Sequence, residues 1–334
     1  MAYITGLMLI DAPASALNNG RGEDTKGVVK KIRTLSGEYP YVSAQSFRFW
    51  LRTTLESLFS NEWNASPVYT SRKEKNQQAY TKGDPIEHPD DDLFGYMRAT
   101  SDETVTRVSP FRVSTVVSIA PVTIVDDFGV MARRGQQPEG EEAREGSVLH
   151  SHEFYRTTLQ ALFSLNLSAT GTFSTEPRTG YQNLGKETLA IAKNQLEVVN
   201  QKNYRLPINE RIRRNRMLLQ GLARIEGGAK QSLHYTDVSS AFTIMAVTTG
   251  GNHIFGHLVH ADNKRHPAIH EQALNQIADT FSNDILSPLY VGRVEGFMDS
   301  AREVFANRNI PVVHPRQAFD QLADDLAKNP QWLD

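Results

Sequence analysis

The chain has 334 residues, with 36 lysines and arginines against 38 aspartates and glutamates, a formal net charge of −2 and no cysteine. This length suggests about two domains, or one domain enlarged by insertions. The absence of cysteine excludes a disulfide scaffold, a cysteine-ligated metal site and a thiol nucleophile. No apolar run is long enough to span a bilayer, so we expect a cytoplasmic protein without a membrane partner. The near-zero net charge argues against a simple basic nucleic-acid binder.

The charges are segregated along the chain despite this balance. Residues 18–55 carry seven basic and three acidic side chains, and residues 203–216 carry five arginines and one glutamate. Acids without a lysine or arginine among them gather in residues 84–92, and further acids lie near the end of the chain. A dipolar chain of this kind can bind a polyanion with one face, whereas the plainer interpretation is a set of solvated helix faces.

The first elements are a strand and a helix. The apolar run over residues 3–10 predicts a buried strand, which leads into a loop rich in Asn and Gly. The spacing of apolar residues predicts a helix over 43–59, with Ser43 as its N-cap. One face of this helix collects Phe47, Leu51, Leu55, Leu58 and Phe59.

The middle of the chain alternates β patterns with irregular polar stretches. Residues 60–107 show no sustained period and are interpreted as a surface insertion. The β-branched segment 111–124 predicts a strand. Residues 126–146 predict a polar, glycine-punctuated loop, and residues 152–173 predict one or two strands with a turn near 169–171.

Helical and β patterns also share the rest of the chain. We predict helices over 185–199, 207–225, 267–281 and 317–328. Strands over 242–248 and 254–260 are predicted to pair around the turn at 249–252. The resulting order, strand–helix–strand–strand–helix–strand, matches the ferredoxin-like, RRM-type split βαβ unit, an α+β fold. With no internal repeat, we interpret residues 1–334 as a single domain with insertions.

The segment PYVSAQSFRFWLR, residues 40–52, combines features that suit an anion. At about 100° per residue, Gln45, Arg48 and Arg52 form one polar stripe. Ser43 and Ser46 lie in the first turn, where free backbone N–H groups and the helix dipole favour negative charge. Arginine forks match phosphate oxygens well. The alternative is an ordinary amphipathic helix whose arginines extend along its side.

The segment EGGAKQS, residues 226–232, contains a second candidate contact. Gly227 and Gly228 could let the backbone approach a ligand closely, with Lys230 and Gln231 supplying side-chain donors. The alternative is a glycine pair that merely ends the preceding helix. Neither a Walker loop nor a GxGxxG turn is present.

The sequence gives little support for catalysis. Five histidines gather in residues 253–270, but HExxH and other metal-ligand spacings are missing, so we expect no metal and no cofactor. Carboxylates at Asp11, Asp24 and the pair Asp126–Asp127 could in principle hold a divalent metal for phosphodiester cleavage. Acid-rich loops are more often simply solvated.

Taken together, these segments resemble the backbone subunit of type I CRISPR surveillance complexes (Cascade). A strand ending in an Asn/Gly loop is followed by basic residues and by PYVSAQSFRFWLRTTL, and later by DDDLFGYM. These two segments resemble most the DevR branch, the CRISPR-associated autoregulators found in type I-B systems. The segment GGAKQS is similar to that family's glycine-containing loop.

The resemblance implies an RRM-like palm, a finger insertion at about 60–107 and a thumb loop at about 120–152. It also implies a non-catalytic protein whose copies pack along the guide RNA (crRNA), present it to target DNA and join other Cascade subunits. Met131 is a candidate thumb wedge. By position, the RNA-binding residues would be Asn18, Asn19, Lys26, Ser43, Gln45, Ser46, Arg48, Arg52, Gly227, Gly228, Lys230 and Gln231.

Two alternatives stay open at this point. One is an RNA-cleaving backbone subunit of the type III kind, which would use Asp24 or Asp126. The other is an unrelated α+β metabolic enzyme, for which a defined pocket with converging histidines would be the distinguishing feature.

Overall fold

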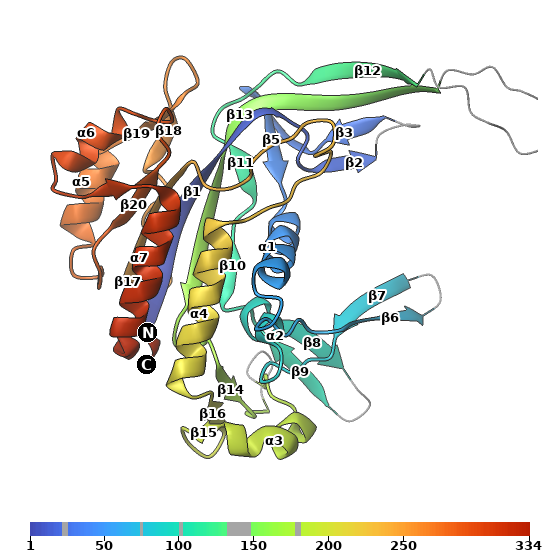
Figure 1. Ribbon diagram of the computed structural model, residues 1–334, viewed down its shortest axis with the longest axis vertical. Coiled ribbons are helices and arrows are strands. Elements are labelled where there is room, and N and C mark those ends of the chain that lie inside the picture. The colour runs from blue at the N-terminus through green and yellow to red at the C-terminus, as the bar shows by residue number, and fades with distance from the viewer. Residues whose placement is uncertain (22–25, 74–75, 100–102, 132–147, 178–181) are drawn as a thin grey trace, which may run out of the picture.

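A large mixed sheet runs through the centre of the computed structural model, which has an α+β fold (Figure 1). The structure describes residues 1–21, 26–73, 76–99, 103–131, 148–177 and 182–334. Along its main path the sheet has the strand order β21-β20-β17-β1-β13-β11-β5-β4. These strands are β1 (Ala2–Ser15), β4 (Lys31–Thr34), β5 (Gly37–Val42), β11 (Val116–Ser118), β13 (Val148–Asn166), β17 (Phe242–Thr249), β20 (Tyr290–Arg293) and β21 (Val312–Val313).

Strand β1 lies between β13 and β17 and pairs antiparallel with both. Its side chains alternate between two cores, so both faces are covered. Met8 and Ile10 pack into the core that includes helices α1 (Ala44–Leu58), α4 (Ile208–Ala223) and α7 (Pro315–Lys328). Leu7 and Leu9 pack into the core beneath α5 (Glu271–Thr280) and α6 (Ala301–Ala306). A strand buried on both faces needs a continuous apolar run, which explains the pattern that identified it in the sequence.

Helices and short strands surround this sheet. No helix in the described ranges is long and apolar enough to cross a membrane. The helices are α1 (Ala44–Leu58), α2 (Pro89–Phe94), α3 (Lys186–Ala192), α4 (Ile208–Ala223), α5 (Glu271–Thr280), α6 (Ala301–Ala306) and α7 (Pro315–Lys328), with 3-10 turns η1 (Lys193–Gln195) and η2 (Pro330–Leu333). The remaining strands are β2 (Asn19–Arg21), β3 (Gly27–Val29), β6 (Val68–Lys73), β7 (Asn76–Thr81), β8 (Tyr96–Ala99), β9 (Thr104–Arg107), β10 (Phe111–Val113), β12 (Val125–Met131), β14 (Thr172–Ser174), β15 (Glu197–Val198), β16 (Asn203–Arg205), β18 (Val259–Ala261) and β19 (Pro267–Ile269).

The elements with the strongest periodicity are confirmed. The predicted strand 3–10 is the central part of β1, and the predicted helix 43–59 is α1, capped by the Ser43 side chain. The predicted helices 207–225 and 317–328 are α4 and α7. Pro207 is the N-cap residue of α4, one position before the expected first turn.

The predicted loop 126–146 is wrong in its first part. Val125–Met131 forms β12, which pairs with β13 in a two-stranded arm that projects from the body of the molecule (Figure 1). The rest of that predicted loop, 132–147, lies outside the described residues. Asp126, Asp127 and Phe128 are all exposed, because the arm stands in solvent and its strand needs no apolar face.

The predicted strand 254–260 is also wrong. Strand β17 pairs with β1 and β20, and residues 254–258 form bends and turns. Phe255 and Leu258 are nevertheless fully buried beneath α5. A short apolar run does not by itself distinguish a buried strand from a buried connection, which accounts for the error. Similarly, the predicted helix 267–281 begins only at Glu271, after β19.

The acidic segment 84–92 is a buried structural element rather than a solvated surface. Helix α2 is buried throughout, and Asp92 has no exposed surface. Its carboxylate accepts hydrogen bonds from the Gly171 N–H at 3.0 Å and from Arg214 at 2.9 Å, and it also pairs with Arg107. The insertion 60–107 is therefore fastened to the body through its own acids.

The arginine-rich segment 203–216 does not form a basic surface. Arg211 and Arg214 are buried inside the molecule, where they bond to carbonyl groups and to Asp92. The remaining arginines pair with carboxylates, in the pairs Arg205–Asp334, Arg213–Glu210 and Arg216–Asp324. Most of the local positive charge is thus paired within the fold, so this segment does not present a row of unpaired arginines among the described residues.

Candidate functional site

A groove lies at the N-terminus of α1, where three distant parts of the chain meet. It encloses about 470 Å³. We call it the α1 groove, and its lining residues are Leu17, Asn18, Asn19, Gln45, Ser46, Phe49, Trp50, Gly228 and Ala229. Five of the predicted RNA-binding residues, Asn18, Asn19, Gln45, Ser46 and Gly228, therefore line one depression.

A hydroxyl–amide network builds the floor of this groove. The Ser43 Oγ accepts a hydrogen bond from the Ser46 N–H at 3.2 Å and caps α1. The Asn18 side-chain amide, which is buried, donates to the Oγ atoms of Ser43 and Ser46 at 3.3 and 3.2 Å. This network fixes the first turn of the helix, whose dipole and remaining N–H groups favour an anion. Gln45 stands exposed beside it.

The glycine loop lies against the opposite wall. Gly227 and Gly228 have φ angles of +153° and +110°, which side chains rarely adopt. A Cβ on Gly227 would overlap the Trp50 ring, and a Cβ on Gly228 would lie 2.6 Å from Leu17 Cδ2. The loop is also joined to the connection between β1 and β2 by a hydrogen bond from the Ala229 N–H to the Leu17 carbonyl at 2.9 Å. The glycines therefore let the loop pack directly on α1.

Two predicted lysines flank strand β3 at the edge of this region. Lys230 is exposed, and a Cβ on Gly27 would lie 4.0 Å from its Cε and 3.8 Å from the Asn19 amide nitrogen. Lys26 forms ion pairs with Asp126 at 2.7 Å and with Glu153 at 3.7 Å. Its hydrogen bond to Asp126 raises the pKa of Lys26. Lys26 thus links β3 to the arm, while the Lys230 side chain extends over β3.

Arg48 and Arg52 lie on a different side of α1, against α2. Arg48 donates to the Phe94 carbonyl and to Ser109 Oγ at 3.1 Å. The Arg52 guanidinium carbon is 4.6 Å from the centre of the Phe94 ring, a cation–π contact. Burial lowers the pKa of both arginines. Both stay partly exposed. Arg52 makes no hydrogen bond or ion pair within the described residues, and its Nε is buried, so its terminal amino groups are the donors left for an anion.

Gln231 holds the glycine loop in shape. Its side-chain amide donates to the carbonyls of Gly227 and Thr236 and accepts from the Thr236 N–H at 2.9 Å. Farther along, His234 lies against the arm, with its Nε2 2.8 Å from His152 Nε2 and its ring stacked on Phe154. The loop therefore bridges α1 and the arm.

Phe49 is a groove residue that sequence reasoning missed. Its side chain is 66% exposed, and it lies one turn after Gln45 on α1. The buried residues of α1 are Phe47, Trp50, Leu51, Thr54 and Leu55. Phe49 is out of phase with that face, and this phase difference is a signal that could have identified it.

Two other predicted residues lie on the arm. Asp126 pairs with Lys26, and Met131 is the last residue of β12, with a side chain outside the described residues. Asp24 also lies outside them. Among the groups that the structure describes, no three His, Asp or Glu side chains converge as metal ligands.

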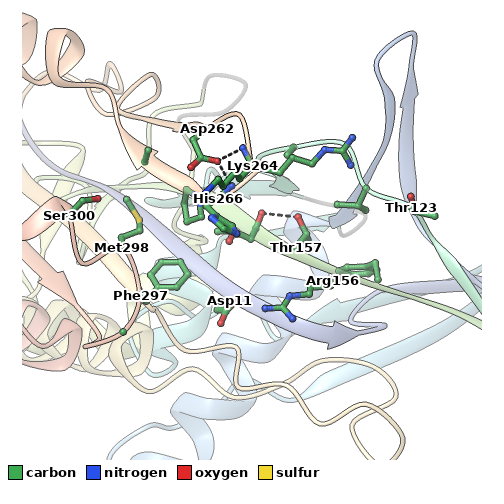
Figure 2. Close-up of a pocket in the computed structure, with 18 of the residues that line it drawn as sticks. Asp11, Thr123, Arg156, Thr157, Asp262, Lys264, His266, Phe297, Met298 and Ser300 are labelled. Carbon is green, nitrogen blue, oxygen red and sulfur yellow. Dashed lines mark hydrogen bonds between the residues drawn. The ribbon is translucent and has the colours of Figure 1, made fainter.

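A second, larger depression of about 780 Å³ lies at the base of the arm (Figure 2). Asp11 and Arg156 line one side, and the hairpin β18–β19 lines the other. The Asp262 carboxylate accepts hydrogen bonds from the N–H groups of Lys264 and His266, both at 2.8 Å, so it shapes the hairpin turn. His266 is the single histidine among the described lining residues, so converging histidines, the mark of the metabolic-enzyme alternative, do not occur here.

Comparisons with known proteins identify a family and, separately, a shared fold. No curated protein matches the chain. Two chains of solved structures, described as a CRISPR RNA-guided surveillance complex and the same complex in a pre-nicking state, are 13% and 10% identical to it. Each alignment covers 97% of this chain and 99% of the other, with a TM-score of 0.56, so the fold is shared. The family model of the CRISPR-associated negative auto-regulator DevR/Csa2 matches residues 15–264. That match confirms the resemblance to the DevR branch, and the chain belongs to the DevR/Csa2 family of CRISPR-associated proteins.

Proposed function

We propose that this protein is the guide-RNA-binding backbone subunit of a type I-B Cascade complex. The observation that carries the proposal is the α1 groove, where Asn18, Ser46 and Gly228 meet from three chain segments. Family membership and the shared fold with chains of RNA-guided surveillance complexes favour the same role.

The groove suits a phosphodiester backbone rather than a particular base. The first turn of α1 offers N–H groups and a positive dipole, and Gln45 and Lys230 add an exposed amide and ammonium group. Arg52 supplies a further cation on the adjoining side of the helix. Contacts of this kind recognise phosphates and carry no sequence information, so one protein can serve any spacer.

The central sheet supports an RRM-like palm. Strands β17, β1, β13 and β11 are adjacent in that order in the sheet. Along the chain, α1 comes after β1 and α4 comes after β13, as in a split βαβ unit. Residues 60–107, with the hairpins β6–β7 and β8–β9, would be the finger, and residues 120–152, with the arm, would be the thumb. In Figure 1 the arm and hairpin β6–β7 project on the same side of the molecule.

This arrangement fits repeated copies along one RNA. A projecting arm and finger leave surfaces that a second copy, other Cascade subunits and target DNA could contact. The described charges are paired locally, as in Lys26–Asp126 and Arg216–Asp324, so copies of the chain would not repel one another strongly. We place this assembly in the cytoplasm, where guide and target meet.

We further propose that the subunit is not a nuclease. Asp126, one candidate for cleavage, is held by Lys26 at 2.7 Å on a solvent-exposed arm. The Lys26 ammonium group competes with any metal ion for this carboxylate, which disfavours Asp126 as a metal ligand for cleavage.

RNA titrations of the full-length chain test the proposal. We expect binding of unrelated single-stranded RNAs of spacer length with similar affinities, and a linear fall of log K with log salt concentration. Lys230→Gln should reduce the steepness of that fall by about one phosphate contact. The matched control is Lys202→Gln, a lysine paired with Glu176 away from the groove, which should leave it unchanged. A chain that binds no RNA, or only one sequence, would contradict the proposal.

A further inference from the structure

An exposed aromatic ring beside polar side chains is the most unusual feature of the α1 groove. Phe49 is 66% exposed and lines the groove together with Gln45, one turn earlier on the helix, and Ser46. A phenylalanine in solvent gains nothing from the core that stabilises the rest of α1. Large exposed aromatics next to hydrogen-bonding groups are typical of binding surfaces.

Asn19 provides a second, independent observation in the same groove. Both polar atoms of its side-chain amide are buried, and no residue in the described parts of the chain forms a hydrogen bond to either of them. A buried amide without partners is unfavourable, so its persistence in a groove wall indicates a role with a partner. An amide can both donate and accept, which matches the hydroxyl of a ribose.

We infer that Phe49 is a stacking platform for one base of the guide RNA, with Asn19 as the polar contact for the same nucleotide. The inference rests on the proposed function and adds to it a contact with the nucleoside. In this arrangement the phosphate lies toward the first turn of α1 and the base lies on the ring one turn further along. One helical turn, about 5.4 Å, separates these two positions along the axis of α1.

Stacking fits the requirements of a guide-binding protein. Every base has a flat aromatic face, so stacking tolerates any sequence. Contact through the face of the base also leaves its Watson–Crick edge available to a complementary strand. The platform therefore supplies affinity that phosphate contacts do not, without selecting one spacer over another.

Phe49 variants distinguish stacking from charge. With single-stranded RNA of spacer length and the full-length chain, Phe49→Ala should weaken binding about 5- to 150-fold at every salt concentration. The slope of log K against log salt should stay as in the wild type, because no phosphate contact is lost. Phe49→Trp should bind at least as tightly as the wild type, and Phe49→Leu should remain weak. Leu58→Ala, which shortens a partly exposed side chain near the end of α1 on the opposite side of the helix from Phe49, is the control and should bind normally.

Each outcome bears on the inference. A 5-iodouridine in the RNA should photocrosslink to the peptide that contains Phe49, and Asn19→Ala should reduce both affinity and crosslinking. Wild-type affinity of Phe49→Ala, with Lys230→Gln still impaired, would reject the platform while leaving the proposed function intact. Full rescue by Phe49→Leu would also reject stacking, since an apolar contact would then suffice. If the wild-type chain bound no RNA at all, the proposed function itself would fail.

Discussion

Asp92 and Arg214 form an ion pair of 2.9 Å in the interior of the molecule, although 122 positions separate them in the chain. Both side chains are almost completely buried, at 0% and 2% exposure. The same carboxylate holds Arg107 and the Gly171 N–H, so it joins α2, α4, β9 and the turn before β14. This one acid fastens the segment 60–107 to the helix that packs on the sheet.

Asp92→Asn should therefore destabilise the fold strongly. The substitution keeps the size of the side chain but leaves the buried Arg107 without its carboxylate partner and Arg214 with Glu210 alone. Removing one partner of a buried pair costs about 3–5 kcal/mol. Urea denaturation at neutral pH measures the free energy of unfolding. The control is Asp324→Asn, which breaks the exposed pair with Arg216 and should cost about 1 kcal/mol or less. Equal effects of the two substitutions would show that Asp92 does not have this structural role.

Because of Asp90, the stability of the protein should fall as the pH rises. Burial, together with the neighbouring Asp91, raises the pKa of Asp90 to about 6 from an ordinary value of 3.8. The folded state then binds the proton more tightly than the unfolded state, so this contribution is full below pH 3.8 and is lost as the pH rises through about 6. Asp90→Asn keeps an acceptor for the Ser66 N–H and should be more stable than wild type at pH 7.5, by up to about 3 kcal/mol. Denaturation curves at pH 4.5 and 7.5 should converge at the lower pH; a constant difference would contradict the assignment.

Gly227→Ala should disturb the glycine loop. The new methyl group would overlap Trp50 on α1, and the φ of +153° would be strained as well. Overpacking and strain together should cost about 3 kcal/mol, measured as a shift in the urea midpoint. Gly250→Ala is the control, since Gly250 also has a positive φ but no atom within 4 Å of its Cβ position, and it should lose only the strain energy. A smaller effect at Gly227 than at Gly250 would mean that the loop does not rest on Trp50.

The contact between His152 and His234 should weaken in acid. With Nε2 atoms 2.8 Å apart, one ring must donate and the other accept, so the contact requires at least one neutral histidine. Burial, the nearby His152 and Lys230 lower the pKa of His234, while Asp127 opposes the change. The stabilisation is therefore present above pH 6.5 and is lost as the pH falls through the lower folded-state pKa.

Hydrogen exchange of residues 230–236 at pH 7.5 and pH 5 measures this loss. We expect protection of that loop, corrected for the intrinsic rates, to fall at pH 5 in the wild type. His234→Phe keeps the ring stacked on Phe154 and should remove the difference between the two pH values. Loss of protection in both proteins would assign the effect to another group.

The sequence revealed elements whose signal is local. Strand β1 and helices α1, α4 and α7 have strong apolar periods, and Ser43 is a recognisable cap. The arm was missed because β12 stands in solvent and carries no alternating apolar pattern. The run 254–260 was mistaken for a strand because burial of Phe255 and Leu258 does not require strand geometry.

For the candidate site too, the features with a local sequence signal were predicted, and those that depend on folding were not. The motif at α1 and the glycine loop were both found in the sequence, and the structure brings Ser46 and Gly228 to one groove. Charge could not be interpreted locally, because Asp92 and Arg214 neutralise each other only through folding. The same limit applies to Arg48 and Arg52, whose contact with Phe94 depends on how α2 packs. Phe49 required knowledge of which helix face is covered.

We propose that this protein holds guide RNA, and the RNA that copurifies with it provides the decisive test. The tagged full-length chain would be expressed with its sister subunits and a CRISPR array of several unrelated spacers, and the bound nucleic acid sequenced and sized. We predict RNA of uniform length from every spacer, in assemblies that contain several copies of the chain. A nucleic-acid-free monomer under these conditions would contradict the account.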